Sequence, residues 1–171
     1  RNQSTRPRDT ASEKPATRKP FFDIGTDPDE GCLPLTVKTM AVSEDESLVY
    51  TWITDSVVVA GSEHYFVIDV PGKIGFSLAA YSENTGCSDT IFNPGMITVF
   101  PKPEAKFEVD YPIAIIDNAN LTFTNLTSDV SDFSWDFGDG SASQQENPQH
   151  RYTAVGKYPV SLITGTEKGC L

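Results

Sequence analysis

The sequence predicts an all-β protein built as a β-sandwich, on three observations. The 171 residues include 12 Pro and 12 Gly, which interrupt the chain too often for long helices. Short apolar runs separated by turn residues recur along the chain, and this spacing is typical of the strands of a sandwich. Some of these runs also alternate apolar and polar residues, as half-buried strands do.

The first 19 residues form a basic tail that we expect to be disordered. They hold six Lys or Arg residues against Asp9 and Glu13, and hardly an apolar side chain, so they cannot form a core. We interpret this segment as a tether to an upstream domain. The alternative is a segment that becomes ordered against an acidic partner.

Residues 20–101 carry the pattern of one sandwich. In the run at 47–54, the side chains of Leu48, Tyr50 and Trp52 share one face, and the run at 74–80 alternates in the same way. Further apolar runs, which complete the set of expected strands, lie at 21–24, 32–37, 57–59, 65–68 and 91–100.

Residues 133–140 read Phe-Ser-Trp-Asp-Phe-Gly-Asp-Gly and are followed by Asn-Pro-Gln-His-Arg-Tyr at 147–152 and by an alternating run at 156–162. We interpret this order as a strand with a buried Trp135, a tight Asp-Gly turn, a Pro-led connection and a second strand. A hairpin of some unrelated β domain is the alternative interpretation.

The motifs W-D-F-G-D-G, N-P-x-H-x-Y and G-x-Y-x-V-x-L, in this order and spacing, resemble those of a PKD domain. The resemblance implies an immunoglobulin-like β-sandwich in a secreted or cell-surface protein. It also implies that the module serves as a spacer, an adhesive segment or an accessory unit.

The two halves of the chain repeat each other, which predicts two tandem sandwiches, at 20–101 and at 102–171. Tyr-Thr-Trp at 50–52 matches Phe-Ser-Trp at 133–135, and the Gly-Lys pair at 72–73 matches the pair that begins with Gly156. The Gly-Cys pair at 86–87, late in the first copy, recurs at 169–170. The first copy lacks the Asp-Gly turn and is therefore a divergent PKD-like copy. Its Gly-Cys-x-Pro-Leu-Thr-Val opening resembles repeat modules of large secreted surface proteins of gliding, type IX-secreting Bacteroidota.

The resemblance assigns structural roles to the aromatic residues of the motifs. Trp52 and Trp135 occupy the strand position that is core in immunoglobulin-like folds. An exposed Trp that stacks on sugar rings is the rival interpretation. We expect Tyr152 to anchor a corner through its hydroxyl group while its ring joins the core.

The Asp-Gly turn has two interpretations. Gly138 and Gly140 supply backbone conformations that residues with a Cβ resist. The carboxylates of Asp136 and Asp139 can accept hydrogen bonds from turn amides, a structural role that needs no ligand. The alternative is calcium, because hard cations take carboxylate oxygens and some PKD-like domains bind this ion, although no D-x-D-x-D-G loop is present.

Three cysteines lack the spacing of a zinc site, so one disulfide with one cysteine left over is expected. We expect the disulfide between Cys32 and Cys87, as an inter-sheet staple of the first copy, with Cys170 unpaired because Asn118 stands near the position that matches Cys32. The second copy ends soon after Cys170, so we also expect its last strand to lie beyond Leu171.

Composition and motifs argue against several classes of function. The formal net charge of −11 disfavours nucleic acids and anionic membranes as partners, and no apolar run is long enough to span a bilayer. No nucleophile elbow, phosphate loop or metalloprotease motif is present, and His64 and His150 have no partner at metal-ligand spacing, so we expect surface or turn histidines and no enzyme.

The predicted function is therefore that of a non-catalytic extracellular spacer or adhesive module of a larger cell-surface protein. It would mediate surface attachment or gliding through protein or glycan contacts and through adjacent domains of the same chain. The alternative is an accessory substrate-binding module of a secreted polysaccharidase or protease.

Overall fold

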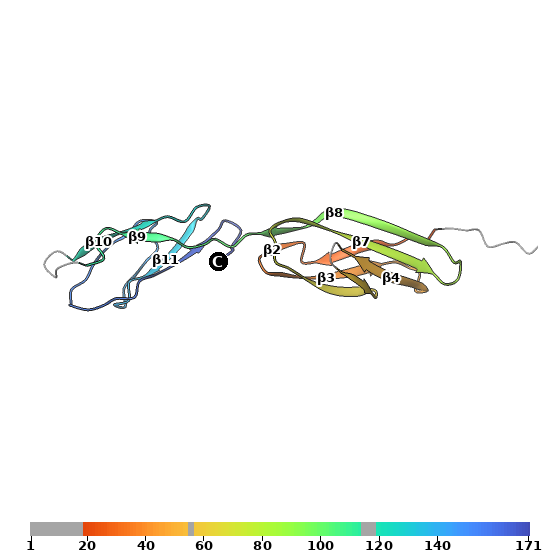
Figure 1. The fold of residues 1–171 in the computed structure, drawn as a ribbon, viewed down its shortest axis with the longest axis horizontal. Helices are drawn as coiled ribbons and strands as arrows, with labels where there is room; N and C mark the ends of the chain where they lie inside the picture. Colours follow the sequence, from red (N-terminus) through yellow and green to blue (C-terminus); the bar gives the residue numbers. More distant parts are fainter. Residues whose placement is uncertain (1–18, 55–56, 114–118) are drawn as a thin grey trace, which may run out of the picture. The chain divides into compact units, whose positions relative to one another are not determined.

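The structure is a computed structural model in which residues 19–54, 57–113 and 119–171 are described (Figure 1). These residues form strands, turns and bends without a helix, which confirms the expected all-β class. None of the described segments forms a helix that could span a bilayer. Of the tail at 1–19 that we expect to be disordered, residues 1–18 lie outside the described ranges, as does Asn118.

The described chain forms two compact units. The first contains the residues up to Gly25 together with Thr39–His64 and Phe76–Asn93. The second contains Thr26–Lys38, Tyr65–Gly75 and Pro94–Leu171.

The N-terminal half of the chain forms two sheets, of three strands in the order β1-β3-β6 and of five in the order β2-β8-β7-β4-β5. The strands are β1 (Asp23–Asp27), β2 (Glu30–Cys32), β3 (Leu35–Val42), β4 (Leu48–Ile53), β5 (Val58–Ala60), β6 (Glu63–Ile68), β7 (Gly72–Ser82) and β8 (Ser88–Phe100).

Strand β4 carries the alternation that the sequence shows. Leu48, Tyr50 and Trp52 are buried, and the intervening side chains are more exposed. β4 pairs with β7 in antiparallel register, so that Trp52 lies opposite Leu78, and Trp52 and Leu78 are both fully buried. Apolar side chains on one face of each strand therefore provide the core, as period-two patterning requires.

The C-terminal half forms two three-stranded sheets, in the orders β13-β10-β9 and β12-β11-β14. The strands are β9 (Phe107–Val109), β10 (Asn120–Asn125), β11 (Asp132–Asp136), β12 (Ala142–Ser143), β13 (Gln149–Arg151) and β14 (Ser161–Gly165). Their buried faces meet in one cluster, in which the ring centroids of Phe123 on β10 and Trp135 on β11 lie 5.7 Å apart.

The strand expected over 156–162 begins later, at Ser161. Ser161 pairs with Asp136, the last residue of β11, so residues 157–160 extend past the end of that strand and lie beside the Asp-Gly turn. Pro159 in this segment also has no N–H to donate to a ladder.

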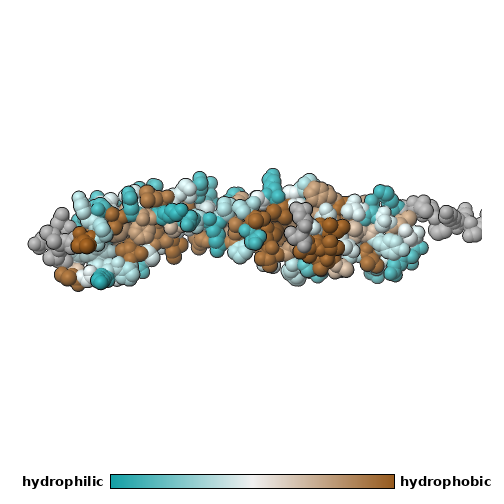
Figure 2. Space-filling view, in the orientation of Figure 1, coloured by the Kyte–Doolittle hydropathy of each residue, from teal (hydrophilic) through white to brown (hydrophobic). Residues whose placement is uncertain are grey.

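Some large apolar side chains remain at the surface (Figure 2). On β6, Tyr65 and Val67 are 62% and 68% exposed, and on β5 Val58 is 69% exposed. Single exposed apolar residues are ordinary on protein surfaces, so these positions alone identify no site.

Candidate functional site

The Asp-Gly turn after β11 is the candidate site that the sequence singles out. Asp136 Oδ1 accepts a hydrogen bond from the Gly138 N–H at 2.8 Å, and Asp139 Oδ1 accepts one from the Ser141 N–H at 3.0 Å. Gly138 and Gly140 have φ angles of 77° and 91°, in the left-handed region. The turn therefore uses both carboxylates and both glycines to hold its own backbone.

Gly138 also faces the backbone of the opposite segment. A Cβ atom at this position would lie 2.6 Å from the Pro159 carbonyl oxygen and 2.9 Å from the Pro159 nitrogen. Real Cβ atoms do not approach backbone atoms so closely, so the close approach requires glycine.

His150 on β13 completes the turn. Its Nε2 lies 2.8 Å from Asp139 Oδ2, and the two side chains are only 14% and 21% exposed. The imidazole stacks on Phe137 at a centroid distance of 4.3 Å. The hydrogen bond with His150, and then the one from Ser141, lower the pKa of Asp139, against the opposing effect of burial. The expectation of a surface or turn histidine missed this pairing.

Tyr152 fixes the other side of the same turn. Its hydroxyl group donates a hydrogen bond to the Phe137 carbonyl oxygen at 2.9 Å, and its ring stacks on Tyr158 at 4.2 Å. Burial is the main reason that the pKa of Tyr152 is raised. Phe137, His150, Tyr152 and Tyr158 thus form a continuous row of rings, which we call the aromatic row.

Gly156 stands in the connection that ends the aromatic row. A Cβ atom there would lie 3.0 Å from the Tyr158 ring. The Tyr158 hydroxyl group closes this connection by donating to the Ala154 carbonyl oxygen at 2.9 Å. Glycine at this position leaves room for the ring that covers Tyr152.

Both tryptophans are buried, and the indole N–H of each donates a hydrogen bond. Trp135 is 1% exposed, and its indole N–H donates to the Gln145 carbonyl oxygen at 2.9 Å. Trp52 is 0% exposed, and its indole N–H donates to the Gly61 carbonyl oxygen at 3.0 Å. Neither ring offers a face on which a sugar could stack, because stacking needs an exposed ring.

Asp139 has His150 beside it, but the turn does not gather the three ligand side chains that a metal site needs in the described part of the chain. Within the described ranges, no three His, Cys, Asp or Glu side chains are grouped so that they could hold a metal ion. In the described residues, Asp136 and Asp139 therefore stabilise the turn. No set of ligands for calcium is found there.

The disulfide joins Cys32 to Cys170, with Cα atoms 5.5 Å apart, and Cys87 is a free thiol. The expected pairing of Cys32 with Cys87 is therefore wrong. Cys32 ends β2, which runs parallel to the end of β8 with Cys32 opposite Phe100. The turn before Cys170 reaches the same place, because the Lys168 ammonium lies 5.1 Å from the Phe100 ring centroid.

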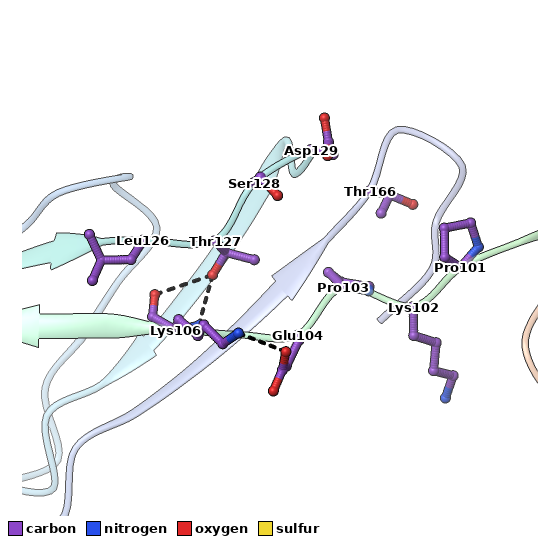
Figure 3. Close-up of a pocket in the computed structure, with 10 residues that line it drawn as sticks. All are labelled: Pro101, Lys102, Pro103, Glu104, Lys106, Leu126, Thr127, Ser128, Asp129 and Thr166. Carbon is purple, nitrogen blue, oxygen red and sulfur yellow. Dashed lines mark hydrogen bonds and ion pairs between the residues drawn. The ribbon is translucent and has the colours of Figure 1, made fainter.

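A hollow of about 240 Å³ lies beside residues 101–104 and is lined by Pro101, Lys102 and Thr166 among others. Figure 3 shows the side chains that line it. At its edge Lys106 forms an ion pair with Glu104 at 2.8 Å, and both side chains are largely exposed. Exposed pairs of this kind contribute about 0–1 kcal/mol, and the hollow contains no nucleophile and base that contact each other.

Comparison with known proteins decides the nature of the C-terminal half. Residues 101–171 match the family model described as a PKD domain. The chain contains a PKD domain. The Asp-Gly turn, the aromatic row and the buried Trp135 all lie within it.

Curated relatives of the chain are bacterial collagenases. Collagenase ColA of Clostridium perfringens (strain 13 / Type A) is 24% identical over 111 residues, which are 61% of this chain and 10% of that protein. A microbial collagenase of Vibrio alginolyticus is 51% identical over 35 residues, 20% of this chain and 4% of that protein. The chain thus spans at most about a tenth of the length of these relatives.

Solved structures with a similar backbone include carbohydrate-binding modules of the β-sandwich superfamily, with a TM-score of 0.43 and 13% identity over 89% of this chain and 86% of the other. Fibronectin(III)-like modules of CbhA from Clostridium thermocellum have a TM-score of 0.37 and 12% identity, over 86% of this chain and 88% of the other.

The N-P-x-H-x-Y element of the PKD domain has a role that its motif does not reveal. Asn147 Oδ1 accepts from the Asn125 N–H at 2.8 Å, and the Pro148 carbonyl oxygen accepts from the Phe123 N–H at 2.9 Å. The element therefore runs along β10, and this path places His150 next to Asp139. The order of the motif was the only signal in the sequence for this contact.

Proposed function

We propose that the chain is a non-catalytic module of a larger extracellular protein, which spaces or attaches the neighbouring domains of that protein. The carrying observation is that the characteristic side chains of the PKD domain are engaged internally. Asp139 binds His150, Tyr152 binds the backbone of Phe137, and Trp135 is buried. Side chains used in this way hold a scaffold together.

The disulfide supports an extracellular location. Cystines form and persist in oxidising compartments and are rare in reducing ones. The net charge of −11 favours solubility of such a module and disfavours polyanions as its partners. Protein or glycan surfaces are therefore the partners that we propose.

We further propose two tandem sandwiches, at 20–101 and 102–171, after a tail at 1–19. Trp52 lies opposite Leu78 in the first copy, and Trp135 lies opposite Leu162 in the second. In both copies the indole N–H donates to a backbone carbonyl nine or ten residues later. This equivalence of register supports repeat modules of the kind found in long surface proteins, such as those used in attachment or gliding.

A second candidate is an accessory module of a secreted protease or polysaccharidase. The matches to collagenases favour a protease. In that case the module would help a separate catalytic domain to reach an insoluble substrate.

Domain replacement in the parent protein tests the proposal. Residues 20–171 are exchanged for unrelated β-sandwiches of similar length, and attachment or substrate turnover by the parent protein is measured. A spacer predicts that function is retained after exchange and lost after deletion. Loss of function on exchange, together with retention of the isolated chain on insoluble collagen, supports the accessory candidate. Turnover of any substrate by the isolated chain contradicts the non-catalytic role.

A further inference from the structure

Cys87 occupies the same place in the first copy as Cys170 does in the second. Cys87 follows β7, and its carbonyl oxygen accepts from the Ser82 N–H at 2.9 Å. Cys170 follows β14, and its carbonyl oxygen accepts from the Thr166 N–H at 3.0 Å. The residue before each cysteine is a glycine in the left-handed region, with φ angles of 70° and 77°.

The strands that lead into these turns are also equivalent. Leu78 on β7 lies opposite Trp52, nine residues before Cys87, and Leu162 on β14 lies opposite Trp135, eight residues before Cys170. The two cysteines therefore end turns that follow corresponding strands of the two copies, and the turn in the first copy is one residue longer. We call these turns the late-cysteine turns (82–87 and 166–170).

In the second copy, the late cysteine is bonded to the copy that precedes it. Cys170 forms its disulfide with Cys32, 138 residues earlier, at the opening of the first copy. Cys87 has no such partner within the chain, because the other two cysteines are bonded to each other. Its side chain is partly exposed, so it is accessible to an external thiol.

The segment that enters each copy runs beside the late-cysteine turn of that copy. In the second copy, Pro101 and Lys102 line the same hollow as Thr166. In the first copy, the Lys19 ammonium binds Asp89, two residues after Cys87, at 3.0 Å. Lys19 therefore lies close to the late-cysteine turn of the first copy, as Pro101 and Lys102 do to that of the second.

We propose that Cys87 forms a disulfide with a cysteine of a further repeat that precedes this chain in the parent protein, at the position that corresponds to Cys32. The inference rests on the proposed tandem organisation. The Sγ–Sγ bond forms as two thiols lose two protons and two electrons. The electrons pass to a thiol oxidant, either an oxidised dithiol protein or a small disulfide, which is reduced to two thiols.

The chemistry of the pair favours this partner over a second copy of the chain. Cys32 of a second chain is already bonded to its own Cys170. The second sequence copy has Asn118 where the match of 121–123 to 35–37 places Cys32, so it offers no early cysteine. The free partner must therefore come from outside the 171 residues.

Peptide mapping of the natural full-length protein tests the proposal. Free thiols are blocked with iodoacetamide, the protein is digested without reduction, and the linked peptides are identified by mass. We expect a Cys32–Cys170 pair and a second pair that joins Cys87 to an early cysteine of the preceding repeat. A Cys87→Ser variant should lose only the second pair and release the upstream cysteine to iodoacetamide.

Three outcomes overturn the proposal: Cys87 alkylated in the natural protein, Cys87 joined to a small thiol, or Cys87 joined to another chain. The absence of an upstream repeat with such a cysteine overturns it as well. Domain replacement reports on the proposed function separately, so a free Cys87 in a protein that tolerates the exchange rejects this inference alone.

Discussion

A Cβ atom on Gly138 would lie 2.6 Å from the carbonyl oxygen of Pro159. The Asp-Gly turn and the segment before β14 are therefore in backbone contact, and only glycine permits it. The contact lies beyond the Asp136–Ser161 pair, which ends the β11–β14 ladder, so the two segments stay together past the last paired residues.

Gly138→Ala should be strongly destabilising, and Gly140→Ala is its matched control. Both positions have φ angles in the left-handed region, which cost a residue with a Cβ about 1–3 kcal/mol. Only Gly138 also meets backbone, since nothing lies within 4 Å of a Cβ at Gly140. We expect the free energy of unfolding in urea to fall by about 1–3 kcal/mol more for Gly138→Ala, as overpacking does. Equal losses in the two variants would show that the close approach is absent.

Tyr152→Phe should lower the free energy of unfolding by about 0.5–1.5 kcal/mol, the usual contribution of one hydrogen bond. The variant leaves the Phe137 carbonyl oxygen without its buried donor. Tyr158→Phe is the control, because its bond to the Ala154 carbonyl oxygen is exposed and water can replace it. A larger loss in Tyr158→Phe than in Tyr152→Phe would contradict the anchoring role of Tyr152.

His150→Phe should raise the pKa of Asp139 towards its ordinary value of 3.8, because the hydrogen bond with His150 is the main cause of the lowering. The new ring can still stack on Phe137. Carboxyl carbon chemical shifts, followed by NMR during an acid titration, measure the pKa, with Asp45 as an internal reference whose partner is Ser47.

The same pair predicts the acid dependence of stability. The pKa of Asp139 is lower in the folded chain than in the unfolded one, so its contribution is present above the ordinary pKa and is lost as the pH falls through the lowered value. The urea midpoint of His150→Phe should therefore decrease less steeply below pH 4 than that of the unmodified chain. If the urea midpoint depended equally on pH in both proteins, Asp139 would not contribute to the acid dependence of stability.

Removal of divalent cations should leave the melting temperature unchanged. Asp136 and Asp139 already accept hydrogen bonds from the turn, which supply the stabilisation that an ion would otherwise provide. Calorimetry in EDTA and in excess calcium measures the difference. A decrease in EDTA of more than about 5 °C, roughly 1 kcal/mol in a domain of this size, would support a bound ion.

Local patterns in the sequence predict much of the fold. Alternation in β4 and β7 identifies the buried faces, because a strand with one face in the core has a period of two. Repetition of the Trp strand and of the late Gly-Cys is the basis of the proposed tandem organisation. The position of Trp135 and Tyr152 follows from the motifs that contain them.

Local patterns do not predict the contacts between segments that are distant in the sequence. Asp139 and His150 are eleven residues apart and meet only because the connection along β10 has a particular length. Three cysteines allow three pairings, and local patterns do not reveal which turn lies beside Cys32. The expected Cys32–Cys87 bond assumed that the disulfide stays within residues 20–101, whereas Cys32 lies opposite Phe100 and is bonded to Cys170.

The disulfide map of the isolated 171-residue chain tests most directly the claim that Cys32 in the N-terminal half is covalently joined to Cys170 in the C-terminal half. The bond closes a segment of 138 residues, so the chain-entropy model assigns it a stabilisation of about 5 kcal/mol. Digestion without reduction, after blocking with iodoacetamide, should yield the Cys32 and Cys170 peptides linked to each other and Cys87 alkylated. A map in which Cys87 is linked to Cys32 or to Cys170 would contradict the account.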